Sequence, residues 1–204
     1  METLKKADLS RWKVVKLALF FEGAIALIAL FWIRWGNLEV PFGFVSNYLL
    51  YSLLGTFPIL TLNGLLFFLL GLTEKRSPYA RFMREYIFPL CASQSMLSAF
   101  FIGLASGIGE EFFFRGALFY FLTGKFGQPI SILVINLLFA YVHFIGNFLE
   151  YWRVFIFYFL FGVYFTFLVM FLNSIWIPVL THALYNWIVI VAMRYYLITK
   201  NPKI

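Results

Sequence analysis

The stretch FVSNYLLYSLLGTFPILTLNGLLFFLLGL, residues 44–72, contains no charged side chain over its 29 residues. A helix needs about 20 predominantly apolar residues to cross the hydrocarbon core of a bilayer. Residues 87–109 form a second uncharged stretch, 23 residues long. Runs of this length are typical of transmembrane helices, and they predict a membrane protein.

The composition of the whole chain agrees with this prediction. Of its 204 residues, 63% are hydrophobic, 23% are aromatic and only 12% are charged, whereas about 25% of residues are charged in an average soluble domain. We therefore predict an all-α, polytopic integral membrane protein with about six transmembrane helices, within a range of six to eight, and with its active site inside the helix bundle. The predicted helices cover residues 17–33, 44–72, 95–123, 129–146, 152–172 and 177–198.

Charge patterning predicts the orientation of this bundle. Basic residues gather before the first predicted helix, between residues 75 and 84, and at the C-terminal end. By the positive-inside rule both termini face the cytoplasm. The net charge of +7 is then explained by topology and anionic lipid, without a nucleic-acid partner. The first helix has no A-x-A cleavage pattern after it and is predicted to be retained.

Three regions follow from this organisation. Residues 1–94 hold the first two helices, a cytoplasmic loop and an interfacial segment within 73–94; residues 95–198 form the expected catalytic core; residues 199–204 are a short basic tail. The single cysteine, Cys91, excludes an internal disulfide and a cysteine-based metal cluster.

Ionisable side chains inside the predicted helices point to a site. Each costs about 2.5–3.5 kcal/mol at the centre of a membrane helix, so such groups usually face the bundle interior and carry function. The ionisable set is Glu22, Glu110, Glu111, Arg115, His143 and His182, and its neutral polar companions are Asn63, Asn136 and Asn186.

The two adjacent glutamates are predicted to play different parts. Glu111 and Arg115 are four residues apart and pair on one helix face. Glu110 points about 100° away and has no local partner, which suits a carboxylate for general acid or base chemistry. Glu22 lies outside this group, and we weigh two interpretations of it. It is either a packing or interfacial residue that snorkels with Lys16 or bonds to another helix, or a residue that lines substrate entry or contacts Arg115.

The chain contains only two histidines, and they lie on different predicted helices. Glu110 and one imidazole can hold and deprotonate a water molecule, while His182 and Asn186, one turn apart, can donate hydrogen bonds to a developing oxyanion. This set of side chains suits the hydrolysis of an amide bond. No serine or cysteine has the neighbours of an activated nucleophile, although Ser98, Ser106 and Cys91 stay open as candidates.

Six straight helices would place Glu110, His143 and His182 at three different depths. We therefore expect tilted or broken helices around a water-filled cavity. Three glycines near the acidic pair permit close helix approach: Gly107, Gly109 and Gly116.

Three short motifs follow one another on the hydrophobic segments. EEFFFR (Glu110–Arg115) fits E-E-x-x-x-R, FAYVH (Phe139–His143) fits F-x-x-x-H, and HALYN (His182–Asn186) fits H-x-x-x-N. In this order they resemble the CPBP family of intramembrane proteases, which includes CAAX prenyl endopeptidases and bacteriocin-processing or self-immunity proteins of the Abi type. The resemblance covers roughly residues 95–198.

The resemblance implies a glutamic-type endopeptidase that needs no cofactor. Glu110 would activate the water, with His143 as its partner. His182 and Asn186 would stabilise the oxyanion.

Supporting roles also follow from the resemblance. Glu111 and Arg115 match positions that organise the site, and Phe139 would pack. The length of the chain is similar to that of compact bacterial members, which implies the bacterial cytoplasmic membrane and a membrane-associated protein or peptide as substrate. The oligomeric state stays open.

Two other functions fit the same residues. Glu and His side chains from three helices can bind zinc with an open position for water, so a zinc metalloprotease is one alternative, although the chain has no H-E-x-x-H. A non-catalytic immunity, scaffold or transport protein is the other, although no inverted repeat typical of transporters is visible.

Overall fold

The computed structural model describes residues 11–44, 46–72, 77–144 and 148–200. Within these ranges the chain forms helices and no strand, which confirms the all-α class. The α-helices are α1 (Arg11–Trp35), α2 (Tyr48–Leu66), α3 (Pro78–Phe82), α4 (Phe88–Ala92), α5 (Met96–Glu111), α6 (Phe119–Phe126), α7 (Gln128–Val142), α8 (Phe148–Leu172) and α9 (Trp176–Lys200). Three π-helical segments join them: η1 (Phe67–Leu72), η2 (Met83–Ile87) and η3 (Phe112–Leu118).

Five helical stretches among the described residues are long and apolar enough to cross a membrane. They are Arg11–Trp35, Tyr48–Leu69, Met96–Phe126, Glu150–Leu172 and Trp176–Thr199. This confirms a polytopic integral membrane protein. The sixth predicted helix is present as α7, but with 15 residues it is shorter than the roughly 20 needed for a full crossing.

The interfacial segment predicted before the catalytic core forms the short helices α3 and α4 with η2 between them. Ser77 caps α3, because its hydroxyl accepts a hydrogen bond from the backbone N–H of Ala80 at 3.0 Å. Ser95 then caps α5 through a reciprocal capping box with Ser98. These caps satisfy N–H groups that a helix start leaves free.

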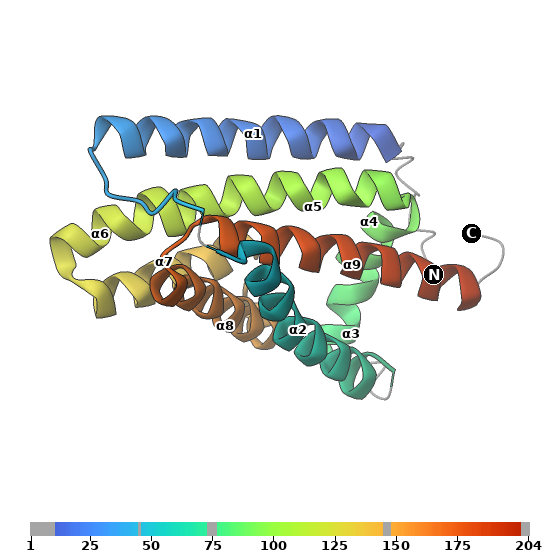
Figure 1. The fold of residues 1–204 in the computed structure, drawn as a ribbon. Helices are drawn as coiled ribbons and strands as arrows, with labels where there is room; N and C mark the ends of the chain where they lie inside the picture. Colours follow the sequence, from blue (N-terminus) through green and yellow to red (C-terminus); the bar gives the residue numbers. More distant parts are fainter. Residues whose placement is uncertain (1–10, 45, 73–76, 145–147, 201–204) are drawn as a thin grey trace.

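Helix α5 is the centre of the bundle. It packs against α1 on one side and α9 on the other, while α2 packs on α9 and α7 packs on α8. α1 begins at the end of the bundle where α9 ends, and α3 and α4 lie at that same end (Figure 1). The long, polar-bearing helix is therefore the one most enclosed by its neighbours.

Glycines make the close contact between α5 and α9. A Cβ atom added at Gly107 would lie 2.6 Å from the carbonyl oxygen of Val179, and one at Gly103 would lie 2.6 Å from that of Ala183. The spacing is a G-x-x-x-G pattern, which allows two helix backbones to approach closely in a membrane. The expectation for Gly107 is therefore met, and Gly103 extends it.

The neighbouring glycines face α1 instead. A Cβ atom at Gly109 would lie 2.4 Å from a carboxylate oxygen of Glu22, and one at Gly116 would lie 3.3 Å from Ile33. Glu22 thus lies against the backbone of Gly109. Among the described residues the ion pair of Arg115 is with Glu111 and not with Glu22, so the predicted contact between Glu22 and Arg115 is not formed.

Gly107→Ala is expected to lower the thermal unfolding midpoint of the purified protein in detergent. The new methyl group meets backbone of α9, which cannot move out of the way, and overpacking of this kind costs about 1–3 kcal/mol. Gly64→Ala in α2 is the matched control, because no atom lies within 4 Å of a Cβ there. Equal midpoints for the two variants would contradict the packing assigned to α5 and α9.

Candidate active site

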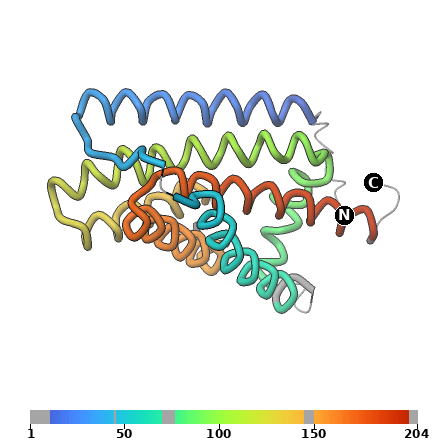
Figure 2. The backbone as a smooth tube through the Cα atoms, in the orientation of Figure 1, coloured from blue at the N-terminus to red at the C-terminus, as the bar shows by residue number. Residues whose placement is uncertain are grey.

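A helical hairpin determines the depth of the site. Gly127 joins α6 to α7 with φ of 76°, a left-handed conformation that favours glycine. The two legs run back along each other (Figure 2). Glu110 and His143 lie at nearly equal distances along the chain from this turn, and both legs rise about 1.5 Å per residue. The short α7 therefore ends beside the acidic pair, which resolves the depth conflict that six straight helices would create.

Glu110 and His143 face each other at the end of α7. The Nε2 atom of His143 lies 3.7 Å from Oε2 of Glu110. Nδ1 of the same ring is 2.7 Å from the carbonyl oxygen of Phe139. Because a carbonyl oxygen only accepts, Nδ1 carries the hydrogen, and in the neutral ring Nε2 is an acceptor.

The neighbouring glutamate belongs to a separate, fully buried network. Nη1 of Arg115 lies 3.3 Å from Oε1 of Glu111, and neither side chain is exposed. The same carboxylate oxygen lies 2.8 Å from Nδ1 of His182. The predicted ion pair is thus present, and it also holds one of the two imidazoles.

Aromatic rings enclose the arginine. Its guanidinium carbon lies 4.2 Å from the ring centroid of Phe139, 5.8 Å from that of Phe114 and 5.6 Å from that of Phe165. Cation–π attraction of this kind gains strength when the cation is removed from water. Phe139 therefore has a packing position against Arg115, in addition to the carbonyl that orients His143.

The segment η3 begins directly after the acidic pair. Its π-helical hydrogen bonding covers Phe112–Leu118 and includes Arg115. π-helical turns inside α-helices occur frequently at functional sites. The sequence predicted a continuous helix at this point, so the irregular turn is a feature that helical periodicity did not indicate.

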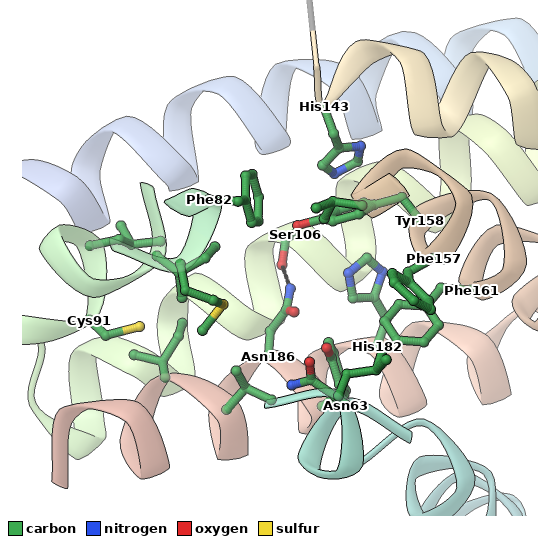
Figure 3. Close-up of a pocket in the computed structure, with 18 of the residues that line it drawn as sticks. Asn63, Phe82, Cys91, Ser106, His143, Phe157, Tyr158, Phe161, His182 and Asn186 are labelled. Atoms are coloured by element: carbon green, nitrogen blue, oxygen red, sulfur yellow. Dashed lines mark hydrogen bonds between the residues drawn. The ribbon is translucent and has the colours of Figure 1, made fainter. Parts of the chain in front are cut away.

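A cavity of about 280 Å³ collects the polar groups of the three motifs. Its polar lining includes Ser106, Glu110, His143, Tyr158, His182 and Asn186. Figure 3 shows the His143 ring above Tyr158, and His182 and Asn186 beyond that tyrosine. The His143 and Tyr158 rings are in contact, with centroids 4.6 Å apart and planes tilted by 43°. Residues far apart in the sequence therefore meet around one space.

Asn186 is oriented by a serine. Its Nδ2 atom donates to the hydroxyl of Ser106 at 2.7 Å (Figure 3), and that hydroxyl lies 3.2 Å from the carbonyl oxygen of Gly103. One N–H of the amide is therefore hydrogen-bonded to Ser106. The other has no hydrogen-bond partner among the described residues and can donate to a ligand in the cavity. Sequence reasoning had considered Ser106 only as a nucleophile, and it gave no signal for Tyr158.

The short helices α3 and α4 contribute one wall of the cavity. The hydroxyl of Tyr79 donates to Oδ1 of Asn63 at 3.2 Å, which ties α3 to α2. Cys91 also lines the cavity, and burial raises the pKa of its thiol to about 12. The thiol is therefore protonated at neutral pH, which does not suit a nucleophile.

Metal binding would need several ligands in one place. Among the described residues, no group of three or more His, Cys, Asp or Glu side chains is arranged to hold a metal ion. The zinc site considered from the sequence thus has no matching ligand cluster in this part of the chain.

Comparison with known proteins agrees with the geometry. A family model described as type II CAAX prenyl endopeptidase Rce1-like matches residues 92–188, from the end of α4 into α9. The match covers just under half of the chain and includes all three motifs. The match supports the resemblance to the CPBP family of intramembrane proteases.

In general terms, the match supports an intramembrane endopeptidase of the CAAX type. Searches of curated proteins and of solved structures give no match. The roles of single residues therefore rest on the geometry of this chain.

Arg115→Met is expected to lower the free energy of unfolding by about 3–5 kcal/mol, because it leaves the buried carboxylate of Glu111 without its cation. Adding Glu111→Gln should recover part of that loss, since the uncompensated charge is then gone. Denaturant unfolding of the two single variants and the double variant in detergent measures the coupling. Strictly additive losses would show that the two side chains do not depend on each other.

Proposed function

We propose that the protein hydrolyses a peptide bond of a membrane-associated protein or peptide by a glutamate mechanism without a covalent intermediate. The observation that carries this proposal is the position of Glu110 Oε2 and His143 Nε2. They lie 3.7 Å apart, both residues line the cavity, and Oε2 has no hydrogen-bond partner among the described residues.

The spacing of these two atoms suits a shared water molecule. One oxygen atom can lie about 2.8 Å from both, at ordinary hydrogen-bond distance. With Nδ1–H of His143 bound to the carbonyl of Phe139, Nε2 accepts one hydrogen of the water and Glu110 accepts the other. The oxygen lone pairs then face the substrate.

Glu110 is the general base in this mechanism. As the water oxygen attacks the carbonyl carbon, one proton passes to Oε2 of Glu110, and the carbonyl oxygen gains negative charge. When the tetrahedral intermediate collapses, the carbon–nitrogen bond breaks and Glu110 returns the proton to the leaving nitrogen. No group of the enzyme is covalently modified.

His182 and Asn186 are the proposed oxyanion donors. Asn186 supplies the N–H that Ser106 leaves free. Since Nδ1–H of His182 is bound to Glu111, its Nε2 donates only when the ring is an imidazolium. In that state the charges of Arg115 and His182 balance those of the two adjacent glutamates, and a neutral cluster is the cheaper one to bury.

Substrate access is proposed from the end of the bundle that carries α3 and α4. The cavity is lined there by Tyr79, Phe82 and Cys91, and the basic residues of the neighbouring loop favour the cytoplasmic side. We extend the proposal to a compact bacterial member in the cytoplasmic membrane with both termini inside the cell, where leader-peptide processing or bacteriocin self-immunity would supply peptides of this kind.

Glu110→Gln and His143→Ala are expected to reduce cleavage by about 10²-fold or more, the range for loss of a general base, in protein that still folds. The substrates are first identified by comparing the membrane and secreted peptidomes of cells with the wild-type protein and with Glu110→Gln. Glu39→Gln, an exposed glutamate far from the cavity, is the matched control and should cleave normally. Undiminished cleavage by purified Glu110→Gln would refute the glutamate mechanism.

The same assay separates the alternatives. The mechanism uses no metal, so activity is expected to survive strong chelation, whereas loss on chelation and recovery with zinc would favour the metalloprotease. If Glu110→Gln retained the biological role of the protein in cells, a non-catalytic role would be favoured instead.

A further inference from the structure

A chain of buried hydrogen bonds reaches the site from the side opposite the cavity. Nη2 of Arg115 donates to Oδ1 of Asn136 on α7 at 3.2 Å. Nδ2 of Asn136 donates to the hydroxyl of Thr166 on α8 at 3.1 Å. Arg115, Asn136 and Thr166 all have an exposed fraction of 0%. Neither Asn136 nor Thr166 belongs to any of the three motifs.

The orientation of the Asn136 amide is determined by its surroundings. Its Nδ2 atom also lies 2.8 Å from the carbonyl oxygen of Ile132, which only accepts. The hydroxyl of Thr166 lies 3.0 Å from the carbonyl oxygen of Gly162 and 3.3 Å from Oδ1 of Asn136. With its single hydrogen in the shorter contact, its oxygen is left as an acceptor for the amide. The contacts with Ile132 and Thr166 both need the NH₂ group of the Asn136 amide. Its Oδ1 atom therefore faces Arg115.

The amide has no room to move. A Cβ atom added at Gly162 would lie 2.6 Å from Oδ1 of Asn136 and 3.0 Å from Nη2 of Arg115. Helix α8 thus presents bare backbone to the pair, and the guanidinium is held between this backbone and the ring of Phe139. The side-chain polar atoms of Asn136 and Thr166 all have partners, and buried polar groups satisfied in this way are held rigidly. Nε of Arg115 and Oε2 of Glu111 have no hydrogen-bond partner among the described residues.

The chain continues from the arginine into the active site. Arg115 and His182 both donate to the same oxygen of Glu111, at 3.3 Å and 2.8 Å. Displacing the guanidinium therefore changes the charge and the position of the oxygen that holds the imidazole. Asn136 supplies the second acceptor without a negative charge, so the arginine has one anionic partner in this network, Glu111.

We infer that Asn136 and Thr166 are positioning residues of the active site, which act through Arg115 and Glu111 to orient the imidazole of His182. The inference rests on the proposed function for the role of His182 and extends it to two residues outside the motifs. It makes α7 and α8 part of the machinery that prepares the oxyanion donor.

Two pairs of variants test this inference. Thr166→Val keeps the shape of the side chain and removes the hydroxyl, whereas Thr166→Ser keeps the hydroxyl. Asn136→Leu removes the amide. Thr56→Val is the matched control, because Thr56 is a buried threonine hydrogen-bonded to backbone of α2 and α9 away from Arg115. If Asn136→Leu does not fold, the Thr166 pair decides the question alone.

The first readout is kinetic. Loss of an outer-shell hydrogen bond typically costs about 10–100-fold in activity, so kcat should fall by about 10-fold in Thr166→Val and Asn136→Leu with KM unchanged. Thr166→Ser and Thr56→Val should match the wild-type protein. An equal loss in Thr56→Val would overturn the inference, because any buried hydroxyl would then have the same effect.

The second readout does not depend on activity. The chain contains two histidines, so a protein labelled with ¹⁵N-histidine has two imidazole spin systems, and His182→Gln assigns them. The Nδ1–H signal of His182 should shift in Thr166→Val and keep its wild-type position in Thr166→Ser. An unchanged signal in folded Thr166→Val would overturn the inference. Failure of the glutamate mechanism would appear as cleavage by Glu110→Gln and would leave these spectra as they are.

Discussion

The burial of Arg115 is the constraint on which the rest of the site depends. A guanidinium with no exposed surface inside a membrane bundle needs an anion, further acceptors and a polarisable surrounding, since removing a charge from water costs several kcal/mol. Glu111, the amide of Asn136 and the ring of Phe139 supply these. Each comes from a different part of the chain, so satisfying one cation brings the motif helices into a single arrangement.

The two walls of the cavity differ in how they are built. On the α5 side, backbone meets backbone at Gly103 and Gly107, and there is no side chain that can change rotamer to open a gap. On the other side, short helices present tyrosine, phenylalanine and methionine side chains, which can rearrange. Glu110 and Ser106 thus stand on the stiffer wall.

Sequence reasoning recovered the class of the fold, the hydrophobic helices and the Glu111–Arg115 pair, because all of these depend on spacing within one segment. It did not indicate Thr166, Gly162 or the orienting role of Ser106, whose contacts lie across helices distant in the sequence. The depth of His143 was also missed. That depth depends on α7 ending after 15 residues, and hydropathy gives no reason to end a helix there.

The turn at Gly127 has a consequence for how such a chain can change over time. The positions of Glu110 and His143 depend on the number of residues between each of them and Gly127. A single residue inserted or deleted in either leg therefore rotates the helix beyond it by about 100° and shifts that helix by about 1.5 Å. Glu110 would then no longer face His143. Substitutions on the lipid-facing surface of α6 and α7 leave this register intact, so the hairpin can vary widely in composition while its length is held constant.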